Sequence, residues 1–282
     1  MNFLCIYNRF YIIAKISKVL GGAKTFFGIY ALAAFLPVCI TVKKEYRIIS
    51  YVLVMFLYLT SLYTTGLNII KQAAAVSICF YGLRYVYSRQ LGRYILTIVV
   101  AMLFHASAAI AIVNYFLWSK YRRNISLKTA FLVIIGSIVL AFAFRKILQV
   151  LTTFSVFSKF AIYIESEIMA NNNLIFVHML VFVFLFLIKK PMISMDRRNA
   201  LLYLLVLIGI CLEFSGFFVI YVKRIAMYFY DIPSIVLLAQ TPLLIRGKEK
   251  TIMYAGVLIF GISLFVIQFA ILGHAHVIPY RI

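Results

Sequence analysis

The feature that most constrains this chain is a series of long apolar runs separated by short connections rich in lysine and arginine. Hydrophobic residues occupy 65% of the 282 positions and charged residues only 12%, whereas a soluble domain has about 25% charged residues. A helix needs about 20 apolar residues to cross a hydrocarbon core of roughly 30 Å. The sequence therefore predicts an all-α, polytopic integral membrane protein with about eight to ten transmembrane helices, and it excludes a water-soluble fold.

The apolar runs predict how the chain is organised along its length. Residues 1–25 mix apolar and basic residues, which predicts an interfacial amphipathic segment. We expect residues 26–272 to form a single transmembrane helical domain and residues 273–282 a short C-terminal tail. The nine candidate spans are residues 26–42, 48–66, 68–88, 93–118, 129–148, 173–190, 199–220, 226–245 and 252–272.

The net charge of +21 arises mostly from lysines and arginines in the connections between these spans. Basic loops prefer the cytoplasmic side of a membrane and are attracted to its anionic lipids. This distribution indicates membrane lipids as partners and gives no reason to expect nucleic acid. We interpret Arg84, Arg89 and Arg93 as topology signals. The strongest basic loops are residues 43–47, 84–93, 120–128, 189–198 and 246–250.

These five basic loops cannot share one side of the membrane if each of the nine segments crosses once. The conflict lies at segment 93–118, whose two ends are both basic and whose straight helix would be about 39 Å long. In one arrangement, this segment is a re-entrant helical hairpin with residues 105–107 near its tip, and all five loops are cytoplasmic. In the other, it is a single tilted helix and one basic loop lies outside.

Several polar residues lie where a bilayer disfavours them. Lys71 and Gln72 stand near the start of one span and His105 lies deep in the next. Such residues cost free energy unless a partner or water is present, so they predict a functional site. The alternatives are structural: Lys71 extends to the membrane interface, and His105 is a hydrogen-bonded packing residue.

Further charged residues gather toward the outer face in the hairpin arrangement. They are Glu213 near the end of its span, Arg224 in a tight connection and Asp231 in the next span. Cations can hold a diphosphate, and a carboxylate or histidine can accept a proton. Glu213 and Arg224 could equally form a structural ion pair. His178 has no metal-site spacing and is interpreted as structural, and no metal is expected.

Four short motifs in order carry a resemblance to a known family. The first two are Asn68-x-x-Lys71-Gln72-x-Ala74 and the string Ala101 to Ala108, which contains Phe104-His105-Ala106-Ser107. The others are Arg224-Ile225-x-x-Tyr228-Phe229 and Ile278-Pro279-Tyr280-Arg281. From about residue 26 to the end, the chain resembles the EpsG family, which are Wzy-type polymerases of bacterial exopolysaccharide, capsule and O-antigen.

This resemblance implies a metal-independent glycosyltransferase without cofactors in the bacterial cytoplasmic (inner) membrane. Such an enzyme transfers a growing glycan from undecaprenyl diphosphate to a sugar hydroxyl of an incoming lipid-linked repeat unit at the outer face. A flippase and a chain-length regulator are the protein partners that this pathway implies. The expected catalytic residues are His105, Glu213 and Asp231. The expected diphosphate- and substrate-binding residues are Asn68, Lys71, Gln72, Ser107, Arg224, Tyr228 and Tyr280.

Two departures from the family pattern affect the expected activity. Lys71 stands where family members carry arginine, which keeps the charge but loses the bidentate fork. The chain also starts late, so we expect earlier spans to be missing and activity to be impaired. Two other functions fit an apolar chain with buried polar residues: a lipid-linked oligosaccharide flippase or transporter, and a membrane O-acyltransferase.

Overall fold

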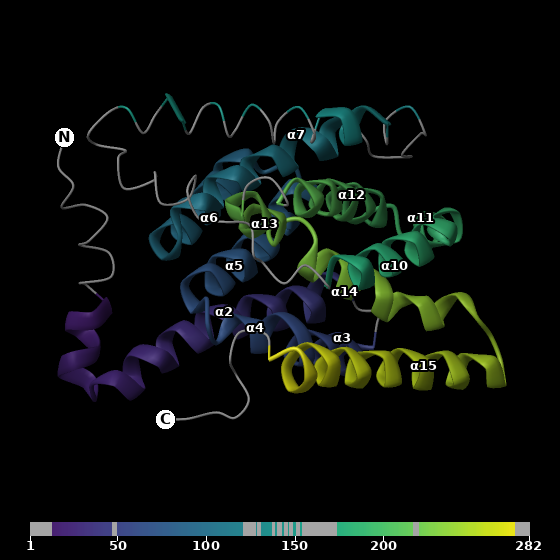
Figure 1. The fold of residues 1–282 in the computed structure, drawn as a ribbon, viewed down its shortest axis with the longest axis horizontal. Helices are drawn as coiled ribbons and strands as arrows, with labels where there is room; N and C mark the ends of the chain where they lie inside the picture. The colour runs from purple at the N-terminus through teal and green to yellow at the C-terminus, as the bar shows by residue number, and fades with distance from the viewer. Residues whose placement is uncertain are drawn as a thin grey trace. The chain divides into compact units, whose positions relative to one another are not determined.

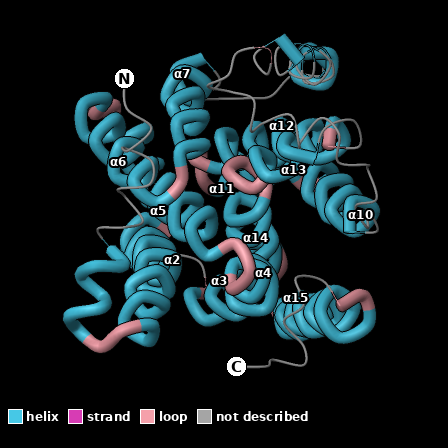
Figure 2. Tube along the Cα trace, turned by 60° about the vertical axis from the view of Figure 1, so that its left-hand side comes forward, coloured by secondary structure: helices cyan, strands magenta, loops and turns pink. Residues whose placement is uncertain are grey.

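The computed structural model describes residues 13–46, 50–120, 174–216 and 220–273, together with scattered positions between 128 and 153. Every regular element in these ranges is helical, and Figure 2 shows only helices and loops there. The predicted all-α fold is confirmed. The chain divides into two compact units, Met1–Phe116 with Ile245–Ile282 (unit 1) and Leu117–Leu244 (unit 2). The predicted domain division stays a prediction.

Unit 1 is built from long apolar helices (Figure 1). Helix α3, a π-helical turn and α4 follow one another without a break, and a 3-10 segment separates α6 from α7. The elements are α2 (Ala23–Glu45), α3 (Tyr51–Tyr58), the π turn Leu59–Tyr63, α4 (Thr64–Gly66), α5 (Ile70–Tyr87), α6 (Leu91–Phe104), the 3-10 segment Ala106–Ile112, α7 (Val113–Lys120, which crosses the unit boundary), α15 (Lys248–Phe265) and the π turn Val266–Ile271.

Unit 2 contains shorter helices around a buried central one, α12, most of whose residues are fully covered. A 3-10 turn follows its last α-helix. The elements are α10 (Leu174–Leu187), α11 (Lys189–Met195), α12 (Asn199–Ser215), α13 (Ile220–Ala226), α14 (Asp231–Gln240) and the 3-10 turn Thr241–Leu244.

The helices follow the predicted spans closely, but most are short. In the described ranges, Ala23–Glu45 and Lys248–Ile271 are long and apolar enough to cross a membrane. A third candidate arises if Ile175–Leu187 and Lys189–Met195, bent by 66°, form one broken span. Predicted span 129–148 lies largely outside the described residues. Helix length and composition therefore support two or three of the nine predicted spans.

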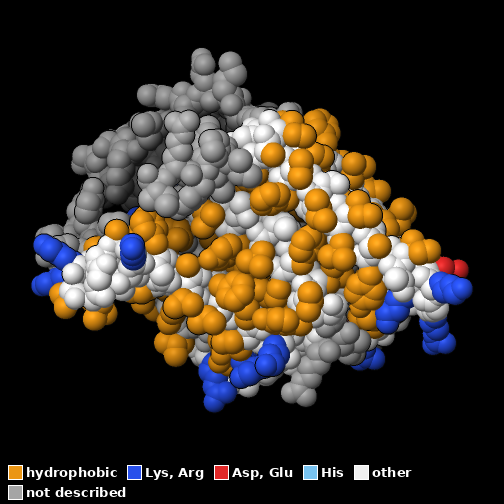
Figure 3. Space-filling view, turned by 90° about the horizontal axis from the view of Figure 1, so that it is seen from below, with side chains coloured by type: hydrophobic (Ala, Val, Ile, Leu, Met, Phe, Trp, Pro, Cys, Tyr) orange, Lys and Arg blue, Asp and Glu red, His pale blue; other side chains and the backbone are white. Residues whose placement is uncertain are grey.

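Many large apolar side chains lie on the surface of the molecule, as expected for helices that face lipid. On α15, Ile252 is 70% exposed and Ile259 is 63% exposed, and on α2 Phe27 is 56% exposed. Figure 3 shows apolar side chains spread over one face, with lysines and arginines toward its margins. A soluble monomer rarely exposes so much contiguous apolar surface. This surface agrees with a membrane protein.

The helices of unit 1 have two chemically different ends. At one end, the rings of Tyr30 and Phe104 meet edge to face 5.5 Å apart, and Ala73 packs in the same cluster. At the other, the hydroxyls of Tyr46 and Tyr87 lie 3.0 Å apart. We name these the tip end and the basic end. Helices α2 and α5, side by side in Figure 1, therefore run parallel from the tip end to the basic end.

Helices α3 and α15 of unit 1 run in the opposite direction. The hydroxyl of Tyr58 on α3 donates to the carbonyl oxygen of Ala34 on α2 over 2.9 Å. Near the ends of their helices, Gln268 Nε2 donates to Thr65 Oγ1 over 3.1 Å. Helices α3 and α15 thus begin at the basic end and finish at the tip end.

Segment 93–118 folds back on itself at His105. Helix α6 ends at Phe104, and His105 adopts an extended conformation with φ −149° and ψ 122°. The Tyr94 hydroxyl in the first turn of α6 then donates to the carbonyl oxygen of Ala111. The Tyr115 hydroxyl donates to the carbonyl oxygen of Arg89 over 3.2 Å. The chain after His105 therefore returns along α6, so the helical hairpin is confirmed and a continuous helix is excluded.

The hairpin explains how both ends of segment 93–118 can be basic. The 14 residues of α6 span about 21 Å, which is less than the roughly 30 Å of a hydrocarbon core. The first arm starts at the basic end of unit 1, and Tyr115 of the second arm returns to Arg89 at that end. That end carries Lys43, Lys44, Arg84, Arg89, Arg93, Arg246 and Lys248, while Lys24 in the first turn of α2 lies toward the tip end. Re-entry into a bilayer stays a prediction.

This hairpin predicts the outcome of cysteine labelling in cells. Cysteines that replace Arg89 and Lys120, in a background lacking the four native cysteines, should react with an impermeant maleimide from the cytoplasmic side only. A cysteine that replaces Asn68, at the tip end, should react from the outside only. Labelling of positions 89 and 120 from opposite sides would contradict the hairpin.

A close helix contact in unit 2 predicts a difference between two glycines. A Cβ at Gly209 of α12 would lie 2.7 Å from the backbone nitrogen of Tyr230, whereas a Cβ at Gly256 of α15 would meet nothing within 4 Å. Gly209→Ala should destabilise the protein by about 1–3 kcal/mol because the contact must open. Gly256→Ala should be neutral or stabilise it by up to about 1 kcal/mol. Thermal unfolding in detergent gives the melting temperatures of both variants, and equal values would contradict the contact between α12 and Tyr230.

Candidate functional site: two polar centres

The first polar centre lies in the turn that joins α4 to α5. Helix α4 ends at Gly66, where a Cβ would lie only 2.7 Å from Cβ of Ala73, so glycine lets the turn close tightly. The backbone N–H of Gln72 donates to the carbonyl oxygen of Ile69 over 2.9 Å as α5 begins. Asn68 and Lys71 are exposed, and the side chain of Gln72 is buried.

The start of α5 favours anions. No side-chain oxygen caps its first turn, because residue 69 is isoleucine. The first N–H groups of a helix carry partial positive charge, and Lys71 adds a full charge in the same turn. The first turn contains no acidic residue. The local electrostatics of this centre therefore suit a phosphate or another anion.

His105 forms the second part of this centre at the tip of the hairpin. Its Nδ1 lies 2.6 Å from the hydroxyl oxygen of Ser107, and both side chains are half-buried. The extended backbone at His105 ends α6 and turns the following residues, so the side chains at 105 and 107 can meet. When Nδ1 carries the proton and donates to Ser107, the lone pair of the neutral imidazole is on Nε2.

The fold brings the two predicted motifs to the same end of unit 1. Phe104, which precedes His105, packs with Ile70, Ala73 and Tyr30 in one hydrophobic cluster. In addition, the Cys79 thiol lies 3.9 Å from the carbonyl oxygen of Ala108, which joins α5 to the 3-10 segment. Asn68, Lys71, Gln72, His105 and Ser107 therefore all lie at the tip end. We call them the tip site.

The second polar centre lies in unit 2 and pairs Glu213 with His178, a contact that the sequence did not predict. Nδ1 of His178 on α10 lies 2.9 Å and 2.7 Å from the two carboxylate oxygens of Glu213 on α12. The rings of His178 and Tyr230 lie 4.4 Å apart. His178 was interpreted as structural because it has no metal-site spacing. A lone histidine in an otherwise apolar helix was the signal that could have found it.

The remaining predicted residues of unit 2 follow Glu213 in the chain. Asp231 is the half-buried first residue of α14, directly after Tyr230, and Tyr228 is buried in the turn before it. Arg224 is exposed near the end of α13. We name the end of unit 2 that holds His178, Glu213 and Tyr230 the polar end. Tyr280 lies outside the described residues.

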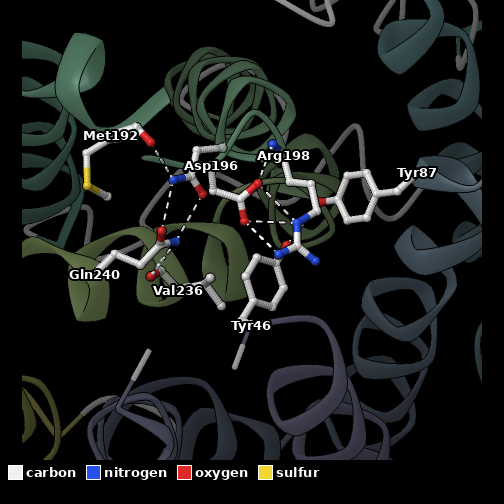
Figure 4. Close-up of polar contacts among 8 residues, drawn as sticks. Tyr46, Tyr87, Met192, Asp196, Arg198, Val236 and Gln240 are labelled. Atoms are coloured by element: carbon white, nitrogen blue, oxygen red, sulfur yellow. Dashed lines mark hydrogen bonds and ion pairs between the residues drawn. The ribbon is translucent and has the colours of Figure 1, made fainter. Parts of the chain in front are cut away.

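The opposite end of unit 2 is held by a structural network rather than a reactive group. The side-chain amides of Asn199 and Gln240 bond reciprocally over 2.8 Å and 3.0 Å, and Asn199 also donates to the carbonyl oxygen of Met192. Arg198 forms an ion pair of 2.7 Å with Asp196 (Figure 4). The basic residues 189, 190, 197 and 198 lie along this end. In unit 2 the polar end thus lies opposite a cluster of basic residues, just as the tip end of unit 1 lies opposite its basic end.

Neither centre has the composition of a metal site. In the described part of the chain, no group of three or more histidine, cysteine, aspartate or glutamate side chains lies close enough to hold a metal ion. The tip site holds a cation, amides, a hydroxyl and a histidine, which are groups that bind anions. The polar end holds a histidine and a carboxylate, which are groups that transfer protons.

Each unit consists of apolar helices with a polar centre at one of its ends. This arrangement defines a helical membrane protein with a candidate site in each unit. The model of the EpsG family matches residues 8–282, nearly the whole chain, and the protein therefore belongs to the EpsG family. Membership supports a membrane protein of polysaccharide biosynthesis, similar to a polysaccharide polymerase. No curated protein and no solved structure gives a significant match.

The amide pair of unit 2 predicts a specific pattern of stability. Asn199→Leu should destabilise the protein by about 1–3 kcal/mol because it leaves the buried amide of Gln240 without this partner. Replacing both residues with leucine should recover part of this loss, since no amide then remains unpaired. The melting temperatures of Asn199→Leu, Gln240→Leu and the double variant in detergent measure the coupling between the two residues. Additive losses would contradict it.

Proposed function

We propose that this protein is a polysaccharide polymerase of the bacterial cytoplasmic membrane. It transfers a growing glycan from undecaprenyl diphosphate to a sugar hydroxyl of an incoming lipid-linked repeat unit at the outer face. The hydroxyl oxygen attacks the anomeric carbon, and the bond from that carbon to the diphosphate breaks. A flippase would supply the repeat units, and a chain-length regulator would act with the polymerase.

The observation that carries this proposal is the tip site. The fold brings Lys71 and His105, from motifs more than 30 residues apart, to the end of unit 1 that lies opposite most of its basic residues. Basic residues favour the cytoplasmic side, so the tip site would face outward, where lipid-linked repeat units are polymerised. Membership in the EpsG family supports the same assignment.

The chemistry of the tip site suits the leaving group. Negative charge develops on the diphosphate as the glycan leaves, and stabilising such charge is usually the largest catalytic effect. Lys71 and the first N–H groups of α5 would supply positive charge there. With the Ser107 hydroxyl donating to Nδ1, the imidazole of His105 would carry its proton on Nε2 and donate a hydrogen bond from there to the diphosphate. Asn68 and Gln72 would complete the binding site.

Replacement of the tip-site residues tests this function in cells. Lys71→Ala and His105→Ala should each reduce polymer by at least about 100-fold, since each removes a group that stabilises the leaving diphosphate. Single lipid-linked repeat units should accumulate while the protein stays in the membrane. Lys71→Arg should retain activity because it keeps the charge. Gel separation of the extracted glycans shows whether a ladder of polymers or only single repeat units are present.

Lys24→Ala is the matched control, because Lys24 is also an exposed lysine toward the tip end but lies on α2. It should give the wild-type ladder. Wild-type ladders from both alanine variants would overturn the role of the tip site. Accumulation of repeat units on the cytoplasmic side would instead indicate a flippase.

A further inference from the structure

A buried glutamine near the end of unit 1's last helix is a polar group that the tip-site chemistry does not use. The buried residues of α15 and of the π turn that follows it are Val257, Gly261, Gln268 and Phe269. Gln268 is the one among these four with a polar side chain, and it is only 7% exposed. Such a group costs free energy in an apolar helix unless it meets a partner. Its Nε2 donates to Oγ1 of Thr65 over 3.1 Å.

This hydrogen bond joins two neighbouring helices at their π turns. Thr65 follows the π turn Leu59–Tyr63 by two residues, and Gln268 lies within the π turn Val266–Ile271. Helix α15 packs against α3 and against the first of these π turns (Figure 1). About two turns before Gln268, a Cβ at Gly261 would lie 2.7 Å from the ring of Phe56 on α3, so the two helices are in close contact. Single π turns inside α-helices occur frequently at functional sites.

Thr65 connects this contact to the tip site through its backbone. Its carbonyl oxygen accepts the N–H of Asn68 over 3.2 Å. The residue after it, Gly66, lies directly against Ala73 of α5. The turn that carries Asn68 and Lys71 is therefore held by α5 on one side and by α15 on the other.

The π turn that precedes Thr65 also packs into the tip end. Tyr63, its last residue, lies in the hydrophobic cluster that contains Ile70 and Phe104. These two residues directly precede Lys71 and His105 in the chain. A shift of this π turn would therefore reach both halves of the tip site, and the hydrogen bond from α15 restrains such a shift.

We propose that Gln268 is a positioning residue of the tip site. Its amide holds Thr65, and Thr65 fixes the turn that presents Asn68 and Lys71 to the diphosphate. This inference rests on the proposed function of the tip site. Gln268 acts only through Thr65 and makes no contact with the diphosphate. The effect is large enough to measure, because a displacement of about 1 Å at a binding group can cost about 100-fold in rate.

Binding of undecaprenyl diphosphate to the purified full-length protein in detergent tests this role. Gln268→Leu should weaken binding by about 10-fold, because the turn loses its restraint from α15. The Thr65 hydroxyl keeps its hydrogen bond of 3.0 Å to the carbonyl oxygen of Ser61, so the fold should persist. Thr65→Ser retains the acceptor hydroxyl and should bind with the wild-type affinity.

Two combined variants separate positioning from stability. Thr65→Val leaves the buried amide of Gln268 without this acceptor, so it should lower both the melting temperature and the affinity. Adding Gln268→Leu to it should recover the melting temperature but not the affinity. In the Lys71→Ala background, Gln268→Leu should weaken binding by less than about twofold, because coupled residues are not additive. A merely structural contact would leave the affinity per folded molecule unchanged in all of these variants relative to their backgrounds.

Gln240→Leu is the matched control, because it makes the same change at a buried glutamine of unit 2 whose amide also bonds a side chain. It should lower the melting temperature and leave the affinity per folded molecule unchanged. Wild-type affinity in Gln268→Leu, together with weakened binding in Lys71→Ala, would overturn the positioning role while the tip site stands. Wild-type affinity in Lys71→Ala would instead overturn the tip site of the proposed function.

Discussion

A hydrocarbon environment makes every polar group without a partner costly, and the arrangement of this chain follows from that cost. Backbone polar groups are satisfied within helices, so the described residues form helices wherever they are apolar. At His105 the helix breaks, and tyrosine hydroxyls from Tyr94 and Tyr115 bond carbonyl oxygens of the neighbouring arm. These two bonds hold the arms of the hairpin together.

The same cost organises the charged side chains within each unit. In unit 1, arginines and lysines gather at the basic end, whereas Lys71 and His105 lie at the tip end. In unit 2, His178 and Glu213 contact each other at the polar end, away from the basic residues near Arg198. Charge that sets topology is therefore separated from charge that is available for chemistry. This separation is what turns costly residues into candidate sites.

The sequence predicted the features that depend on composition and on charge along the chain. Basic residues at both ends of segment 93–118 made a hairpin one of two predicted arrangements, and the helix breaks at His105, where that arrangement placed the tip. Contacts between distant helices were not predictable, because one sequence gives no pairing between residues such as His178 and Glu213. The structure adds this pairing to the interpretation of His178 as structural. The tip site, in contrast, was predicted from motifs, although the tyrosines that close its hairpin were not.

Each unit holds a polar centre with its own chemistry. The tip site supplies groups for an anion, and the polar end supplies a histidine backed by a carboxylate. Membership in the EpsG family agrees with the polymerase.

The most direct test of the proposed polymerase function uses the purified wild-type protein alone in proteoliposomes that contain undecaprenyl-diphosphate-linked repeat units. We predict that it forms a ladder of lipid-linked polymers and releases one undecaprenyl diphosphate for each repeat added. Movement of repeat units between leaflets without any ladder would contradict the account.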